Sequence, residues 1–311
     1  MYLRFPKRLH LELTDACNAK CPMCKRNDAY TLEETSLVKN ISLDYDLLVK
    51  TFGEKQFDQV KLCGNNGEPF ANKEVFKIIE YFSPRTKVIT ANTNGSLRSE
   101  SFWAKAGKIP NLEVVWGIDG ITQESHHLYR VNTNLEKILK NAKAFIDAGG
   151  NAIWNMIVFK HNEDEVESAK KLSEEIGFAE FKFVHTRRFY RSDTHKYIWN
   201  DKEYTLEKSS QTETQPIKFY ENKTYDKIVC QGESTEEIYI EATGEVWPCC
   251  YITKDNEIAR NASDYNIRNK PIEDIVNSLY FDEVKNSFTN KPMKLCELTC
   301  GHNLRNLRIT K

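Results

Sequence analysis

The sequence predicts an α/β protein: a partial, TIM-like (β/α)6 barrel followed by a small cysteine-rich C-terminal domain. Over residues 1–190, short strand-like runs alternate with amphipathic helical runs, an order typical of βα units around a parallel sheet. Nine cysteines occur among the 311 residues, and five of them lie between 230 and 300. Clustered cysteines in a reducing compartment are more often metal ligands or catalysts than disulfides. The chain is therefore predicted to be a metalloprotein.

The composition argues against several classes of partner. Lysine and arginine total 44 against 45 for aspartate and glutamate, so the chain lacks the basic surplus that nucleic-acid phosphates require. No run approaches the roughly 20 apolar residues of a membrane span. The N-terminal stretch also lacks the apolar core of a secretory signal. We expect a cytoplasmic protein with no nucleic-acid and no membrane partner.

Six strands are expected in the barrel. In the first, Leu9, Leu11 and Leu13 alternate with polar residues. The second ends at the turn 64–67, and Asp119 stops the fourth. Six βα units are too few for an eight-unit barrel but suffice for an open one. The expected strands are 9–13, 59–63, 87–91, 112–118, 152–159 and 181–184.

The helices between these strands are predicted from apolar faces at helical spacing. One such face covers 75–82, and a longer stripe over 135–146 ends before Gly149. A further helix is expected to begin with Asn162 as its N-cap and to end at Gly177.

Residues 191–229 break this rhythm, because they are polar and rich in Ser, Thr, Lys, Glu and Gln. We interpret them as a bridge or substrate-facing insertion rather than a core element. One amphipathic helix is expected over 272–288. The predicted domains are thus the barrel, 1–190, the bridge, 191–229, and the cysteine-rich domain, 230–311. Aromatic residues of the bridge that can line a pocket are Tyr197, Trp199, Tyr204 and Tyr220.

Three cysteines follow the first strand directly. Cys17, Cys21 and Cys24 form C-x3-C-x2-C, and three thiolates on one short loop can bind one iron–sulfur cube. Such a cube normally takes four ligands, so one iron is left open for a small molecule. A structural zinc site is usually closed by four protein ligands.

This spacing at the end of a first βα strand resembles the radical S-adenosylmethionine (SAM) superfamily, over about residues 8–187. Asn66-Gly67-Glu68-Pro69 is similar to the family's GGE-type motif, whose backbone and acidic group hold the SAM amino group. Arg130 stands where relatives place a partner for the SAM carboxylate. Met23 and Gly117 depart from the pattern, which often has an aromatic and a serine there. The cofactor-binding residues implied by the resemblance are Asn66, Gly67, Glu68, Pro69, Asn94, Asp119 and Arg130.

The resemblance implies the reaction type. SAM would chelate the open iron of a 4Fe–4S cluster, and an electron would cleave it to methionine and a 5′-deoxyadenosyl radical. That radical abstracts a hydrogen from an unactivated carbon, while the protein positions the substrate and excludes oxygen and water. An electron donor such as flavodoxin or ferredoxin is implied as a partner.

The C-terminal cysteines resemble a second known arrangement. Cys230, thirteen residues, Gly244, four residues and Cys249 are similar to the opening of a SPASM or twitch extension. Cys296 and Cys300 can supply the remaining ligands, which closes one auxiliary 4Fe–4S cluster. Two auxiliary clusters need more than the five cysteines present. Cys249 completes the spacing, Cys250 stays open as its alternative, and structural zinc stays open as the alternative metal.

The predicted function is a radical SAM enzyme of the oxidoreductase type: a dehydrogenase, a peptide-modifying enzyme or an epimerase. Its substrate is expected to be a peptide or protein side chain, or a small alcohol or sugar-like metabolite. Only sixteen residues precede Cys17, which we take to leave no room for a separate N-terminal domain. Cys63 can return a hydrogen atom to a product radical, or can be a buried apolar residue. The alternative class is a non-catalytic iron–sulfur or zinc protein, an electron carrier or binding scaffold.

Overall fold

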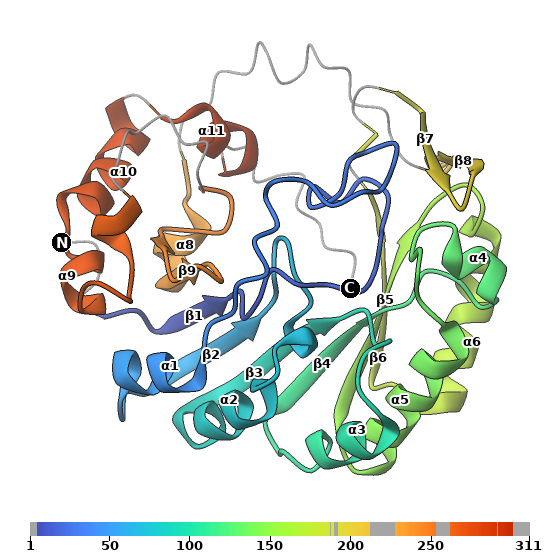
Figure 1. Ribbon diagram of the computed structural model, residues 1–311, viewed down its shortest axis with the longest axis horizontal. Coiled ribbons are helices and arrows are strands. Elements are labelled where there is room, and N and C mark those ends of the chain that lie inside the picture. Colours follow the sequence, from blue (N-terminus) through green and yellow to red (C-terminus); the bar gives the residue numbers. More distant parts are fainter. Residues whose placement is uncertain are drawn as a thin grey trace.

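The computed structural model describes residues 5–186, 188, 189, 192–211, 228–252, 262–290 and 292–300 (Figure 1). An eight-stranded sheet in the order β10-β9-β1-β2-β3-β4-β5-β6 forms its centre. Strands β1 to β6 pair in parallel, which confirms the α/β class and the partial barrel. These strands are β1 (Arg8–Leu11), β2 (Phe57–Leu62), β3 (Thr86–Thr93), β4 (Leu112–Gly117), β5 (Asn151–Val158) and β6 (Glu180–His185).

Helices line the outer face of this curved sheet (Figure 1). In β2, Val60 and Leu62 are fully buried in the core beneath the helices, and the alternate position Cys63 lines a cavity inside the barrel. Local capping fixes the helix ends, as where the Asn134 side chain accepts a hydrogen bond from the Lys137 amide. The helices are α1 (Tyr45–Phe52), α2 (Val75–Phe82), α3 (Glu100–Ala106), α4 (Gln123–His127), α5 (Leu135–Asp147) and α6 (Val166–Ile176).

The start of α6 differs from the prediction. Asn162 makes no side-chain cap, and α6 begins only at Val166, after a short 3-10 turn. The Asn162 side chain instead accepts from the Phe159 amide at 2.7 Å and donates to the Asp119 carbonyl at 2.8 Å. Its amide therefore ties the end of β5 to the loop after β4.

The C-terminal region continues the barrel sheet. Strand β9 (Glu237–Ile240) pairs in parallel with β1, and β10 (Val246–Trp247) pairs antiparallel with β9. The prediction of one helix over 272–288 was wrong, because the chain leaves helical geometry at Asn277 between α9 and α10. The helices of this region are α8 (Gln231–Thr235), α9 (Ile272–Val276), α10 (Leu279–Asn290) and α11 (Lys294–Cys300).

The described part of the bridge contains a β-hairpin, β7 (Thr194–Trp199) and β8 (Lys202–Glu207). Tyr197 and Leu206 of this hairpin are buried in a small cluster separate from the main core, together with Tyr129 and Phe159, and the role of this segment as a bridge or substrate-facing insertion stays a prediction. Tyr197 stacks on Tyr204 and donates to the Leu128 carbonyl at 2.7 Å. Residues 191 and 212–227, with Tyr220, lie outside the described part of the chain, and the domain boundaries stay predictions.

Within the described ranges, no helix is both long enough and apolar enough to cross a membrane.

Candidate functional site

The first three cysteines lie in the loop between β1 and α1, at the carboxyl end of the parallel strands. Cys17, Cys21 and Cys24 line one cavity of about 330 Å³, together with loop 63–68 and Arg130. Ligands commonly bind at this end of parallel α/β folds, because loops from successive strands meet there. The structure therefore brings the predicted iron ligands to one cavity with five of the predicted SAM contacts, Asn66, Gly67, Glu68, Asn94 and Arg130, whereas Pro69 and Asp119 do not line it.

Hydrogen bonds to neighbouring segments hold the cysteine loop. The Asp15 carboxylate accepts from the Lys39 and Ile41 amides at 2.6 and 2.8 Å. The Asn94 side chain donates to the Cys17 sulfur at 3.7 Å. Burial raises the pKa of the Cys17 thiol to about 12, so a bound metal must displace its proton.

At Gly67, loop 63–68 passes the backbone before the cysteine loop so closely that there is no room for a side chain. A Cβ at Gly67 would lie 1.8 Å from the Thr14 carbonyl oxygen, so only glycine fits. The buried Glu68 carboxylate accepts from the Thr93 hydroxyl at 2.8 Å and the Asn94 amide at 2.7 Å. Burial raises the pKa of Glu68 to about 7. The carboxylate thus joins this loop to the end of β3, and Pro69 begins the following 3-10 turn.

Arg130 is held by the predicted Asp119. The carboxylate of Asp119 is fully buried, and it accepts from Arg130 Nε at 2.5 Å and from the Ile157 amide at 2.6 Å. A Cβ at Gly117 would lie 2.5 Å from Arg130 Nη2. The guanidinium therefore occupies the space of a side chain at position 117. This contact is a reason for glycine at position 117 in this chain.

Two buried charged residues escaped the sequence prediction. Arg26 donates from Nε to the Asn66 carbonyl at 2.8 Å and from Nη2 to Glu34 at 3.0 Å. Glu12 accepts from the backbone amides of Asn66 and Gly67. The one available signal was position, because Arg26 follows the third cysteine by two residues and Glu12 is a charged residue within the expected strand 9–13.

The cavity retains polar groups that suit a polar ligand. Asn66 Oδ1 and Arg26 Nη1 are buried and make no hydrogen bond to any described residue. A buried polar atom without a partner is costly, and a bound ligand can satisfy it. With three thiols beside them, these groups fit an amino acid moiety bound next to a cluster. The described residues hold no ready-made group of three or more His, Cys, Asp or Glu around a single-ion site.

Further side chains line the same cavity. Cys63 lies in its wall, and burial raises the pKa of this thiol to about 11. Arg188, which follows β6, donates from Nη1 to the Met23 carbonyl and to the Tyr129 hydroxyl, both at 3.0 Å. Arg188 thus fastens the far side of the cavity to the cysteine loop.

The C-terminal cysteines line a second, much smaller cavity of about 10 Å³. Its other walls are largely apolar, with Ile228, Ile252 and Phe288 among them. Burial raises the pKa of Cys249 to about 12. Cys250 is absent from this lining, and its carbonyl accepts from the Asn65 side chain at 2.9 Å. The cysteines that line this cavity are Cys230, Cys249, Cys296 and Cys300.

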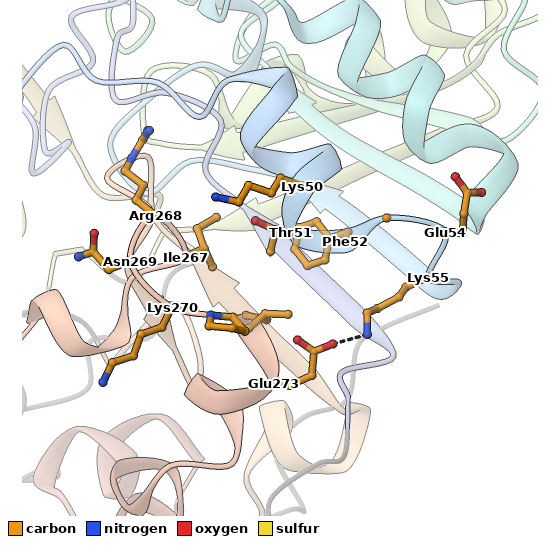
Figure 2. A pocket seen from close by; sticks show the side chains of 13 residues that line it. Lys50, Thr51, Phe52, Glu54, Lys55, Ile267, Arg268, Asn269, Lys270 and Glu273 are labelled. Carbon is orange, nitrogen blue, oxygen red and sulfur yellow. Dashed lines mark hydrogen bonds and ion pairs between the residues drawn. The ribbon is translucent and has the colours of Figure 1, made fainter.

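A groove of about 610 Å³ separates the end of α1 from the segment before α9 (Figure 2). An ion pair between Lys55 and Glu273 crosses it, and Arg268 and Lys270 point away from it (Figure 2). Arg268 pairs with Asp44 at 3.3 Å, so its charge is already satisfied. The groove is a seam between the barrel and the C-terminal region.

Comparisons with known proteins identify the family. The family model of the radical SAM superfamily matches residues 11–172, and that of SPASM, an iron–sulfur cluster-binding domain, matches residues 230–301. The first match covers just over half of the chain, which therefore belongs to the radical SAM superfamily. It is a radical SAM enzyme with a SPASM region, and the predicted cofactors, 4Fe–4S clusters and SAM, are those these domains imply.

Named relatives cover part of the chain. A GTP 3′,8-cyclase of Hydrogenovibrio crunogenus is 30% identical over 186 residues, which are 57% of this chain and 54% of the relative. An AdoMet-dependent heme synthase of Methanosarcina barkeri is 25% identical over 175 residues, which are 55% of this chain and 48% of the relative. The chain thus spans about half the length of these relatives.

Solved structures match over more of the chain. Streptococcus suis SuiB bound to S-adenosylmethionine has a TM-score of 0.64 at 15% identity, over 96% of this chain and 71% of SuiB. The protein anSMEcpe with bound AdoMet has a TM-score of 0.58 at 17% identity, over 89% of this chain and 82% of the other. These likenesses show that the fold is shared over both regions.

Proposed function

We propose that this protein cleaves SAM reductively and abstracts a hydrogen atom from a side-chain carbon of a peptide or protein substrate, which it then oxidises or remodels. One observation carries the proposal: Cys17, Cys21, Cys24, loop 63–68 and Arg130 line a single cavity. An electron carrier or scaffold needs the cysteines but not the other two elements.

The residues of the cavity divide the binding of SAM among them. Cys17, Cys21 and Cys24 would hold the cluster, which when bound would supply the electron that cleaves the sulfonium. Arg130, fixed by Asp119, presents its guanidinium to the SAM carboxylate. Asn66 Oδ1, which has no partner among the described residues, accepts from the SAM amino group. Glu68 and Asn94 hold the loop around it.

The substrate class rests on which neighbours match the whole chain. SuiB bound to the precursor peptide SuiA aligns over 97% of this chain, with a TM-score of 0.64. The protein anSMEcpe with the Cp18Cys peptide aligns over 89%, with a TM-score of 0.56. The GTP 3′,8-cyclase of Hydrogenovibrio crunogenus matches only 57% of the chain. Two peptide-bound neighbours that share the fold over both regions support a peptide rather than a small alcohol or sugar-like metabolite as the proposed substrate.

The C-terminal region would hold one auxiliary 4Fe–4S cluster, with Cys249 rather than Cys250 as a ligand. The four cysteines that share its cavity match the four ligands of a closed cluster. Apolar walls keep water from the site and favour a redox role, in which the cluster accepts the electron left on the substrate radical. An external donor of the flavodoxin or ferredoxin class would reduce the first cluster.

Cys63 decides between oxidation and a redox-neutral outcome. Its thiol lines the cavity and stays protonated at neutral pH, because burial raises its pKa. A protonated thiol is the form that can donate a hydrogen atom to a substrate radical. An oxidation needs no such donor, so the Cys63→Ala variant should make its product at the normal rate, whereas an epimerase would stall.

The test uses the anaerobically reconstituted chain with dithionite, SAM and a peptide encoded by a neighbouring gene, deuterated at its side-chain carbons. The expected result is 5′-deoxyadenosine that carries one deuterium, together with a modified peptide. Deuterium transfer from a labelled sugar or alcohol instead of the peptide would move the proposal to the metabolite class. SAM binding without any 5′-deoxyadenosine, or zinc in place of iron, would indicate a scaffold.

A further inference from the structure

A buried carboxylate links the C-terminal region to the loop that we assign to SAM. Glu12, directly after β1, is 1% exposed. One of its oxygens accepts from the Asn66 amide at 2.6 Å and the Gly67 amide at 3.2 Å. The other accepts from the Tyr239 hydroxyl, on β9, at 2.6 Å. Glu12 therefore holds the loop with one oxygen and the C-terminal region with the other.

These contacts set the orientation of the loop's peptide planes. A trans peptide is planar, so an amide aimed at Glu12 sends the preceding carbonyl the opposite way. For the Asn66–Gly67 peptide, that carbonyl is held by Arg26 at 2.8 Å. Gly64 leaves the space that the carboxylate occupies, because a Cβ there would lie 2.9 Å from Glu12 Oε1. The backbone that faces the cavity is thus fixed from outside it.

A second contact joins the same two parts. The Asn65 side chain donates to the carbonyl of Cys250, and Cys250 adjoins Cys249, which lines the second cysteine cavity. Strand β9 is itself paired with β1, and the Glu12 amide donates to the Ile240 carbonyl at 2.9 Å. The path from one cysteine cavity to the other therefore runs through neighbouring hydrogen bonds and one sheet.

We propose that Glu12, with Tyr239 and Asn65, is a positioning residue through which the C-terminal iron–sulfur region holds loop 63–68 in the shape that binds SAM. This inference rests on the proposed function. Its consequence is that SAM affinity depends on Glu12 and Tyr239, two side chains that do not line the SAM cavity. A disturbance at the auxiliary cysteines reaches the first cavity by the same contacts.

The test measures the SAM dissociation constant of the reconstituted full chain by anaerobic equilibrium dialysis. Tyr239→Phe removes one hydrogen bond to a charged group and should weaken SAM binding about tenfold. Glu12→Ala should weaken it further, and Glu12→Gln should recover most of the loss because its oxygen still accepts from the two amides. Tyr81→Phe is the matched control: it removes another buried hydroxyl bond, to the Gly53 carbonyl, and should leave the constant unchanged.

A double-mutant cycle tests the link to the auxiliary cysteines. Cys296→Ala should raise the SAM dissociation constant in the wild-type background, and should raise it less when Tyr239→Phe and Asn65→Ala are already present. The SAM-induced change in the electron paramagnetic resonance signal of the reduced first cluster should weaken in the same order. If Glu12, Tyr239 and Asn65 had a purely structural role, their substitution would lower the melting temperature but would not weaken the SAM-induced change in this signal.

The outcomes separate the two proposals. If Tyr239→Phe binds SAM as tightly as Tyr81→Phe does, or if the cycle is additive, the positioning role of Glu12 is wrong and the proposed function stands. If the wild-type chain with a full complement of iron does not bind SAM at all, the proposed function itself fails. Tyr239→Phe and Asn65→Ala keep the test decisive if Glu12→Ala does not fold.

Discussion

The two cysteine regions differ in where their ligands come from and in what surrounds them. Cys17, Cys21 and Cys24 belong to one short loop and face a cavity of about 330 Å³ with charged and amide walls. The C-terminal cysteines come from segments 230, 249 and 296–300 and enclose about 10 Å³ among apolar side chains. One site is open and polar, and the other is closed and apolar.

This difference matches two kinds of cluster chemistry. An open polar site with three thiols leaves room for a ligand that exchanges at the fourth iron. A closed apolar site with four thiols shields a group that only accepts or passes electrons. We therefore propose that SAM is cleaved in the barrel and that the C-terminal region takes part in the later electron transfer.

The largest effect is expected from the open site. Cys21→Ala should abolish 5′-deoxyadenosine formation, because the chain then lacks one of the three thiols that hold the SAM-cleaving cluster. Liquid chromatography of reaction mixtures with dithionite and SAM measures the product. Cys250→Ala is the control and should retain activity, since Cys250 lines neither cysteine cavity. Equal losses in both variants would contradict the assignment.

Iron content separates the two sites next. The wild-type chain should hold about eight irons, as two 4Fe–4S clusters. Cys249→Ala should reduce this to about four, whereas Cys250→Ala should leave it at about eight. Iron and sulfide assays under anaerobic conditions give the numbers. About four irons with zinc in the wild-type chain would show that the closed site is a zinc site.

A smaller effect is expected at the arginine of the open site. Gly117→Ala places a Cβ 2.5 Å from Arg130 Nη2, closer than van der Waals contact allows, so the guanidinium must move. Loss of one charged hydrogen bond should weaken SAM binding about tenfold without lowering iron content. In an Arg130→Met background the same substitution should add little. An equal loss in both backgrounds would show that Gly117 acts without Arg130.

The smallest effect concerns stability at acid pH, where the barrel should be the sensitive region. Burial and the nearby Arg130 lower the pKa of His126 to about 3, so it stays neutral in the folded state. The unfolded chain takes up this proton below its ordinary pKa of about 6.5. Stability is therefore present above that value and is lost as pH falls toward 3, by up to about 1.4 kcal/mol per pH unit.

Thermal unfolding between pH 7 and 5 checks this slope. His126→Gln should reduce this slope, because the glutamine does not titrate, but should not remove it, because burial also lowers the pKa of His10 and of His161 to about 4. Residues 228–300 contain no histidine, so this part of the chain adds no such histidine term. A slope unchanged in His126→Gln would place the acid sensitivity elsewhere.

Local patterns predicted most of the barrel. Alternation in the first strand and the apolar stripe of α5 are properties of adjacent residues, so they are visible in the sequence. The three barrel cysteines were found for the same reason, since their spacing is local. The pair Asn200-Asp201 at the turn of the β7–β8 hairpin was also a local signal, because Asn and Asp are favoured in such turns, and both residues have positive φ in the structure. The polar composition of the segment obscured this signal.

Long-range contacts were not predictable in this way. Nothing near Glu12 indicates that its partner is Tyr239, more than 200 residues later. The pairing of β9 with β1 and the contact between Gly117 and Arg130 depend likewise on how distant segments meet. The Asn162 side chain accepts a hydrogen bond from the Phe159 amide and does not cap the start of the helix, where its position in the sequence had suggested a cap.

One experiment on Cys249→Ala tests most directly the proposal that the barrel cleaves SAM and the C-terminal region takes part in the later electron transfer. The reconstituted variant is given saturating SAM, dithionite and the peptide substrate, and both products are quantified in a single turnover. We expect that 5′-deoxyadenosine still forms while the modified peptide does not. If the variant retains the iron of the first cluster and binds SAM, yet forms no 5′-deoxyadenosine, the account is contradicted.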